Sequence, residues 1–329
     1  MTAHEARPWL VTGAQGLLAR ALLGHLAGAG ITAVAAGRGD LDITDRKAVQ
    51  AAFTGRPPAV VINCAAWTAV DAAEDHEAQA LAVNGTGARL LAEACRASGS
   101  VLLQPSTDYV FDGRAREPYP EHAPTGPRSA YGRTKLAGEQ AVLHTLPDTG
   151  YVVRTSWLYG AGGNSFVGTV LGLERERETL EVVDDQWGQP TWTADLAAQL
   201  VQLGRGALAG TAPAGVYHGS NGGATTWFAF CREIFRLLGA DPERVRPLTS
   251  DRYARPAPRP AYSVLGHGRW HAAGMAPLRH WHAALAEALP AMRHRPAEEP
   301  AGPAGGPAAP AETSETMREE AEITCDRCP

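Results

Sequence analysis

Residues 9–19, WLVTGAQGLLA, indicate the fold most clearly. The first four residues form a short apolar run typical of a β-strand, and an apolar-rich helix is expected over 17–29. Gly13 and Gly16 lie between them and permit a tight turn with close approach of the backbone to a ligand. Amide groups at the start of the helix could then hold a pyrophosphate. The stretch predicts a dinucleotide-binding unit, with an ordinary glycine turn as the alternative.

Short β-rich runs alternate with helix-like runs on the C-terminal side of this unit. Further strands are expected at 31–36, 59–63, 100–104 and 151–157. The alternation favours right-handed β-α-β crossovers and a Rossmann-like, doubly wound parallel sheet in an α/β fold. The strands are almost continuously apolar, as expected when both faces of a sheet are buried.

The pattern loosens after residue 160, which suggests three regions. We expect a NAD(P)-binding domain over 1–160 and a smaller substrate-binding lobe over 161–294, some segments of which return to the first domain. The Pro/Ala/Glu-rich composition of 295–329 cannot bury a core, so this acidic tail is expected to be disordered.

Composition excludes several classes of protein. The net charge is −5, but residues 296–329 hold eight acidic residues and two arginines, so the rest of the chain is nearly neutral. Without the tail the chain has no excess of positive charge, which binding to nucleic acid or to an anionic membrane would require. No secretion signal and no apolar run long enough for a membrane span is present, which predicts a cytoplasmic protein. The five cysteines form no disulfide framework, and the CxxC of Cys325 and Cys328 lacks the second ligand pair of a zinc site.

The end of the second expected strand bears on the choice of cofactor. The sequence there is AAGRGD (35–40), with Arg38 near the place where an acidic residue would bind a ribose 2′-hydroxyl. An arginine instead suits a 2′-phosphate through bidentate contacts. This favours NADPH over NADH, although Arg38 could also be a solvated loop residue.

A second stretch, AYGRTKLAGE (130–139), places Tyr131 and Lys135 one helical turn apart on the same face. In QPSTDYVFDG (104–113), Thr107 follows the fourth strand, at the sheet edge where ligands bind in open α/β folds. Together they form a constellation for reducing a carbonyl. Tyr131 would donate a proton to the developing alkoxide, and Thr107 would hydrogen-bond the same oxygen.

Lys135 would adjust the acidity of Tyr131. A free tyrosine has a pKa of about 10, and a cation about 4 Å away is worth roughly 4 kcal/mol at an effective dielectric constant near 20, or about three pKa units. The ammonium could also hydrogen-bond the nicotinamide ribose. The alternative is an accidental YxxxK on a solvated helix face; the glycine turn and Thr107 favour catalysis.

Seven segments of the sequence, taken together, indicate one protein family. They are TGAQGLLA, VVINCAAWTAVDAAE, STDYVFDG, AYGRTKLAGE, RTSWLYG, VVDDQWGQPT and RPAYSVL, in order over residues 9–290. The chain resembles the dTDP-4-dehydrorhamnose reductases, of the extended short-chain dehydrogenase/reductase superfamily, and within them the dTDP-dihydrostreptose synthase type. The resemblance implies NAD(P)H-dependent reduction of the C4 carbonyl of a dTDP-4-dehydro-6-deoxy-L-hexose, giving dTDP-L-rhamnose or dTDP-L-dihydrostreptose in deoxysugar or antibiotic biosynthesis.

The residues and the resemblance together give a set of site predictions. Catalysis is assigned to Tyr131, Lys135 and Thr107. Cofactor binding is assigned to Tyr131 and Lys135 and to Gly13, Gln15, Gly16, Leu17, Leu18, Arg38, Asp42, Ile43, Ala65, Ala66 and Trp67. The resemblance puts Asp42 and Ile43 by the adenine. Substrate binding is assigned to Thr107, Asp108, Trp157 and Arg259, with Trp157 as a flat apolar wall and Arg259 against the diphosphate. Trp157 could instead be a core residue. Arg252 and Arg255, in the same proline-rich loop as Arg259, are further candidates, and Arg252 could instead be a solvated charge.

The chain departs from the family pattern in the first helix, at Trp67 and in the acidic tail, which is not part of that pattern. Some members dimerise through magnesium held by carboxylates, one of them a glutamate early in the first helix, where this chain has Arg20, Ala21 and Leu22. We therefore expect no metal ligand and no magnesium-linked dimer, only a monomer or homodimer. Trp67 stands where the family often has histidine.

The rival functions are a catalytically silent NADP-binding regulatory subunit and a nucleotide-sugar epimerase or dehydratase.

Overall fold

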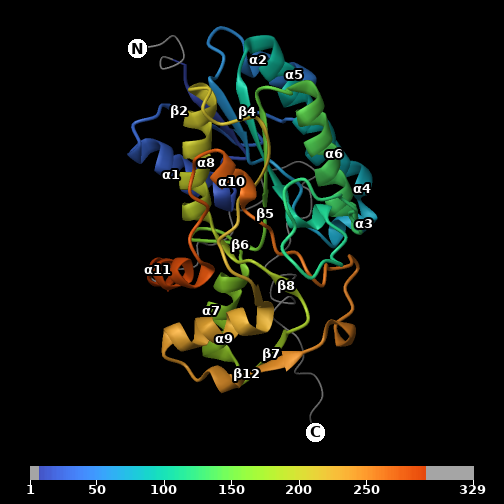
Figure 1. Cartoon of the computed structure of the whole chain (residues 1–329), viewed down its shortest axis with the longest axis vertical. Coiled ribbons are helices and arrows are strands. Elements are labelled where there is room, and N and C mark those ends of the chain that lie inside the picture. Colours follow the sequence, from blue (N-terminus) through green and yellow to red (C-terminus); the bar gives the residue numbers. More distant parts are fainter. Residues whose placement is uncertain (1–6, 294–329) are drawn as a thin grey trace.

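A computed structural model describes residues 7–293, so the predicted tail over 295–329 and its CxxC lie outside the described residues. Six parallel strands form the main sheet, in the order β2-β1-β3-β4-β5-β10 (Figure 1). Their bounds are β1 (Trp9–Thr12), β2 (Ala33–Ala36), β3 (Val60–Asn63), β4 (Val101–Thr107), β5 (Gly150–Thr155) and β10 (Gly215–His218). The predicted doubly wound parallel sheet is confirmed. The strand order reverses between β1 and β3, and their carboxyl ends mark the switch point where ligands bind in such sheets.

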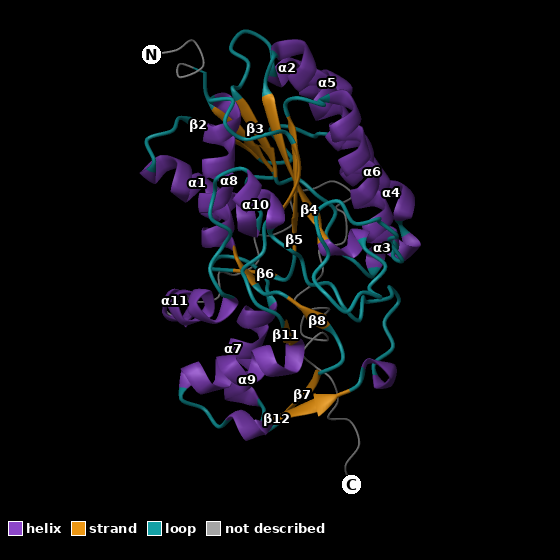
Figure 2. Cartoon of the chain, in the orientation of Figure 1, coloured by secondary structure: helices purple, strands orange, loops and turns teal. Residues whose placement is uncertain are grey.

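Helices cover both faces of this sheet (Figure 2). One face carries α1 (Leu17–Gly28), α8 (Thr193–Leu208) and α10 (Gly268–Ala272), and the other α2 (Arg46–Ala52), α5 (Ala88–Ser98) and α6 (Ala130–Thr145). In β3, Val60 and Ile62 enter the first core and Val61 enters the second. Alternate residues of each inner strand are buried on opposite faces, so these strands are apolar over most of their length, and polar residues such as Thr12, Asn63 and Gln104 lie toward their carboxyl ends.

Segments beyond residue 160 return to the main sheet. Strand β10 pairs with β5, and α8 packs against α1. The contact is close at Gly204 of α8, where a methyl group would lie 2.5 Å from the ring of Trp9. This return was expected only in general terms, because periodicity does not show which sheet a strand joins.

A second set of elements builds a smaller unit, drawn below the sheet in Figure 1. It contains α7 (Phe166–Glu176), α9 (Trp227–Leu238) and α11 (Trp281–Arg293), with β7 (Leu180–Val183) paired to β12 (Val245–Leu248). These share an apolar core of their own. Short pairs join β6 (Leu158–Tyr159) to β9 (Thr191–Trp192) and β8 (Trp187–Gly188) to β11 (Thr225–Thr226). The domain boundaries given above remain predictions. None of the helices within 7–293 is both long and apolar enough to cross a membrane.

Candidate active site

The glycine turn after β1 brings two backbones into contact. Gly13 has φ +60°, and a methyl group on it would lie 2.6 Å from the backbone nitrogen of Ala65. Gly16 is the N-cap of α1 and supplies no side-chain cap. The N–H groups of Leu17 and Leu18, in the first helical turn, have no acceptor within the helix. The turn therefore fits a dinucleotide phosphate at a helix N-terminus.

The end of β2 forms one rim of this turn. The Gln15 amide lies over Gly37, 3.3 Å from the position of a methyl group there. The Arg38 side chain is 66% exposed and its Nε lies 3.9 Å from an Asp42 carboxylate oxygen. Burial raises the pKa of Asp42, but hydrogen bonds from the Thr44 amide and hydroxyl, with the Arg38 charge, outweigh it and leave the pKa below its ordinary value. Arg38 is thus available to a 2′-phosphate.

Ile43, unlike Arg38 and Asp42, is a core residue. Its side chain is 3% exposed and belongs to the core beneath α2 and α5. A methyl group on Gly87 would lie 2.7 Å from its Cδ1. Packing therefore accounts for the Ile43 side chain, and its assignment to the adenine stays a prediction.

The segment after β3 is tied to α6 by a residue that sequence reasoning missed. The Trp67 N–H donates to Asn84 Oδ1 at 2.9 Å, and Asn84 Nδ2 donates to Trp67 O and Thr134 Oγ1, each at 3.1 Å. Asn84 lies in a π-helical turn, η1 (Ala82–Gly87), between α4 (Glu77–Leu81) and α5. Only the glycine break in the predicted helix signalled this turn. Asn84 thus ties Trp67, in the segment after β3, to Thr134 of α6.

Helix α6 presents Tyr131 and Lys135 one turn apart, as the spacing predicts. Lys135 is buried and its Nζ donates to the carbonyl of Pro105 at 2.7 Å. Burial lowers the pKa of Lys135 to about 8, against the opposing charge of Glu139. Tyr131 is half-buried and packs edge-on against Tyr109, with ring centroids 5.7 Å apart.

The strand-end hydroxyl is paired with a buried acid. Thr107, the last residue of β4, donates from Oγ1 to Asp108 Oδ1 at 3.1 Å and accepts the Tyr109 N–H at 3.2 Å. Burial raises the pKa of Asp108 to about 6 in spite of hydrogen bonds from Ser263 and Thr107. Ser106 Oγ is buried without a hydrogen-bond partner among the described residues. The edge of β4 thus presents polar groups that a substrate oxygen could engage.

A buried ion pair lies one turn beyond Lys135. The Arg154 guanidinium donates to both carboxylate oxygens of Glu139, at 2.8–3.2 Å, and the two side chains are 5% and 1% exposed. Arg154 also lies over the Phe111 ring, 5.0 Å from its centroid. Because Arg154 occupies the Glu139 carboxylate, the Lys135 ammonium is left to the Pro105 carbonyl and to a ligand.

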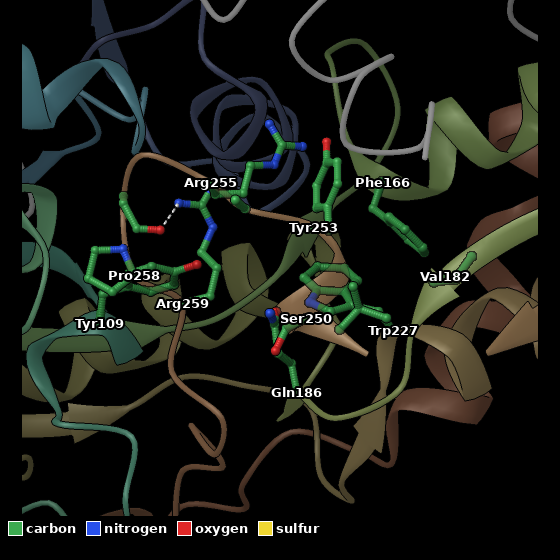
Figure 3. A pocket seen from close by; sticks show the side chains of 13 residues that line it. Tyr109, Phe166, Val182, Gln186, Trp227, Ser250, Tyr253, Arg255, Pro258 and Arg259 are labelled. Carbon is green, nitrogen blue, oxygen red and sulfur yellow. Dashed lines mark hydrogen bonds between the residues drawn. The ribbon is translucent and has the colours of Figure 1, made fainter. Parts of the chain in front are cut away.

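A cavity of about 300 Å³ opens beside Tyr109 (Figure 3). It is lined by Tyr109, Phe166, Val182, Val183, Gln186, Trp227, Ser250, Tyr253, Ala254, Arg255, Ala257, Pro258 and Arg259. Figure 3 shows the two arginines with Tyr109 on one side and Trp227, Phe166 and Val182 on the other. An apolar aromatic wall facing guanidinium groups suits a ligand with a flat base and an anionic group. Tyr109 lines this cavity and also packs against Tyr131.

Trp157 stands behind the aromatic wall. Its ring stacks on Trp227 with centroids 3.5 Å apart and planes at 11°. It has φ +46°, an uncommon backbone conformation for a bulky residue that is often found at functional sites. A methyl group on Gly188 would lie 2.5 Å from the ring. Sequence reasoning selected Trp157 but missed Trp227, whose place at the start of a helix gave no signal.

Arg259 and Arg255 share a carboxylate from the other half of the chain. Arg259 Nη1 and Nη2 donate to the two oxygens of Asp71 at 2.7 and 2.9 Å, and Arg255 Nη1 lies 3.5 Å away from it. Arg255 Nη2 is buried without a hydrogen-bond partner among the described residues. Arg252, in the short 3₁₀ helix η4 (Ser250–Arg252), is exposed and does not line the cavity.

Within residues 7–293, no three His, Cys, Asp or Glu side chains cluster as a metal site requires. In the first helix, Arg20 Nη1 donates to the carbonyl of Gly162 at 2.7 Å.

Known proteins resemble this chain over almost its whole described length. A dTDP-4-dehydrorhamnose reductase of Streptomyces griseus is 61% identical over 303 residues, covering 92% of this chain and all of that protein. A dTDP-4-keto-6-deoxy-D-glucose reductase of Streptomyces niveus is 55% identical, covering 86% of this chain and 96% of that protein. The crystal structure of a dTDP-4-dehydrorhamnose reductase from Bacillus anthracis in complex with NADP is 36% identical, with a TM-score of 0.82, over 87% of this chain and 99% of that one.

The family model described as the RmlD substrate binding domain matches residues 7–294. The site geometry, the sheet topology and these likenesses agree with the resemblance found in the sequence. The chain therefore belongs to the RmlD substrate-binding domain family.

Proposed function

We propose that this protein is an NADPH-dependent reductase of the C4 carbonyl of a dTDP-4-dehydro-6-deoxyhexose. The relatives named above carry this activity in their names, and one related crystal structure holds NADP. The observation that supports the proposal is the contact of α6 with the end of β4: Lys135 donates to the carbonyl of Pro105, two residues before Thr107, and Tyr131 packs against Tyr109, two residues after it.

Each residue has a defined task in this reaction. Bound NADPH supplies the hydride that adds to C4 of the sugar. Tyr131 donates its phenolic proton to O4, so that the carbonyl becomes a hydroxyl. Thr107 hydrogen-bonds O4 and orients it. Lys135, held at the Pro105 carbonyl, keeps a positive charge beside the phenol and stabilises the phenolate that remains.

The cavity supplies the binding of the nucleotide. The aromatic wall of Trp227 and Phe166 suits the thymine base, and Arg255 suits the diphosphate because one of its donors is unpaired. Asp108 suits the sugar hydroxyls. The product is dTDP-L-rhamnose or dTDP-L-dihydrostreptose, according to the shape of the sugar subsite. We further infer a monomer or homodimer that uses no magnesium at Arg20.

The test is direct. Purified protein is mixed with NADPH and either dTDP-4-dehydrorhamnose or dTDP-4-keto-6-deoxy-D-glucose, NADPH loss is followed by absorbance, and the sugar is identified by NMR. Tyr131→Phe should lose nearly all turnover and keep NADPH affinity, because only the proton donor is removed. NADPH binding without consumption in the wild type would favour the silent regulatory subunit. Conversion of the sugar without net NADPH oxidation would favour an epimerase or dehydratase.

A further inference from the structure

Three polar side chains form a buried row across the centre of the sheet. Thr12 of β1 is in register with Asn63 of β3, and Gln104 of β4 follows directly after the last β3–β4 pair. The three are 0%, 2% and 3% exposed. Two residues earlier on the same face, the corresponding places hold the apolar Leu10, Val61 and Leu102. A polar row in an otherwise apolar layer lowers the stability of the protein unless each of its polar groups has a hydrogen-bond partner.

The hydrogen bonds of the row run in one direction. Thr12 Oγ1 donates to Asn63 Oδ1 at 2.6 Å, Asn63 Nδ2 donates to Gln104 Oε1 at 2.8 Å, and Gln104 Nε2 donates to the Pro105 carbonyl at 3.1 Å. Because the Pro105 carbonyl can only accept, Gln104 must turn its NH₂ toward it. Each amide orientation therefore determines the next, back to the Thr12 hydroxyl.

The two ends of the row meet the two halves of the active site. At one end, the Pro105 carbonyl also accepts the Lys135 ammonium at 2.7 Å. At the other, Thr12 Oγ1 accepts the Ala65 N–H at 3.3 Å, and Ala65 is the residue that Gly13 approaches at the cofactor turn. A continuous series of hydrogen bonds thus links the dinucleotide turn to the catalytic lysine.

We propose that Thr12, Asn63 and Gln104 are positioning residues for the reduction. The row holds the Pro105 carbonyl, which fixes one N–H of the Lys135 ammonium and directs the other two toward Tyr131 and the cofactor ribose. The inference rests on the proposed function for its catalytic consequence only. It predicts that breaking the hydrogen bonds of the row leaves the Lys135 ammonium less firmly held, although no group that touches the substrate is removed.

The first test uses a matched pair of buried glutamines. Gln104→Met keeps the length of the side chain but removes its hydrogen bonds. Gln199→Met is the control, because Gln199 is 4% exposed in α8 and, among the residues that the structure describes, its side chain bonds only the Ala276 carbonyl, at 3.4 Å. Gln104→Met should lower kcat about tenfold, as expected for a misplaced catalytic group, with the KM of NADPH and of the sugar within about twofold. Gln199→Met should keep wild-type kcat.

The second test follows coupling along the row. Thr12→Val is isosteric and loses the hydroxyl, whereas Thr12→Ser retains it. Thr12→Val should lower kcat as Gln104→Met does, Thr12→Ser should restore it, and the double variant should be no slower than the slower single one, because the residues act as a unit. Effects that multiply, or a Gln104→Met kcat equal to that of Gln199→Met, would overturn the proposal.

A spectroscopic test is independent of turnover. The chain contains two lysines, Lys47, which is exposed, and Lys135. With ¹³C-labelled lysine, two Cε signals should appear, and Lys47→Arg assigns them. The Lys135 signal should change its chemical shift in Gln104→Met and Thr12→Val but not in Gln199→Met. An unchanged shift in the first two variants would refute the proposal that the row positions Lys135. A wild type inactive on all dTDP-keto sugars refutes the proposed function instead and leaves this readout intact.

Discussion

The Asp71 carboxylate receives the Arg259 guanidinium through two parallel hydrogen bonds of 2.7 and 2.9 Å, across 188 positions of sequence. Both side chains are almost buried, at 10% and 12% exposure. Asp71 also accepts the Ala257 N–H at 3.0 Å. The proline-rich loop that lines the cavity is therefore anchored to the loop that follows β3, and Arg259 reaches a substrate only with its charge already paired.

Asp71→Asn should loosen this loop. Removing one charge of a buried pair costs about 3–5 kcal/mol, because the arginines remain buried without a counter-charge. We expect a lower free energy of unfolding and a higher KM for the sugar nucleotide, measured by urea denaturation and initial rates. Glu77→Gln is the control: its bidentate partner Arg133 is 44% exposed, and exposed pairs are worth up to about 1 kcal/mol. Equal destabilisation in both variants would remove Asp71 as an anchor.

Gly188→Ala should disturb the aromatic wall, because its methyl group would enter the Trp157 ring. Overpacking of this kind costs about 1–3 kcal/mol. Since Trp157 stacks on Trp227, which lines the cavity, the KM of the sugar nucleotide should rise more than the KM of NADPH. Gly172→Ala in α7 is the control, because no neighbour lies within 4 Å of its new methyl group and alanine favours a helix. A Gly188→Ala protein with wild-type stability and KM would show that the ring can move freely.

Local features were predicted correctly because their geometry is set within a few residues. The turn from Gly13 to Gly16 and the spacing of Tyr131 and Lys135 follow from backbone conformation and helical periodicity. The parallel, doubly wound sheet followed from the alternation of strands with helices, but the order of its strands was not predicted.

Pairings between distant segments were not predicted. Asp71 stands in a segment that the family resemblance includes, but nothing local shows that its partner is Arg259. Gln104 and Asn63 look like ordinary strand-end residues until the register places them side by side. Trp227 lines the cavity because α9 packs against α7, β7 and β12 in the smaller unit. These features depend on tertiary structure, which residue patterns alone do not encode.

The pH dependence should follow Lys135. Its pKa of about 8 lies below the ordinary lysine value of 10.5 because of burial. In the proposed mechanism the ammonium is needed beside Tyr131, so kcat/KM should fall as pH rises through about 8, and Lys135 Cε should titrate there by NMR. Between pH 8 and 10.5 the unfolded chain binds more protons at this lysine than the folded one. Its contribution to stability therefore rises with pH in that window. An activity that stays constant up to pH 10 would exclude this role, unless bound NADPH is shown to move the titration.

Arg38→Ala should change the choice of cofactor. Arg38 lies just after β2, beside the glycine turn, and its side chain is largely exposed. Its Nε is 3.9 Å from an Asp42 carboxylate oxygen, which is too far for a hydrogen bond, so the guanidinium is open to a 2′-phosphate. Charge-assisted hydrogen bonds are worth about 1.5–3 kcal/mol, which predicts a KM for NADPH roughly 10- to 100-fold higher, while the KM for NADH stays within about twofold. Initial rates with both cofactors measure this, and Arg96→Ala, an exposed arginine in the last turn of α5, is the charge-matched control. Equal losses with NADPH and NADH would assign Arg38 to the stability of the turn instead of to the phosphate.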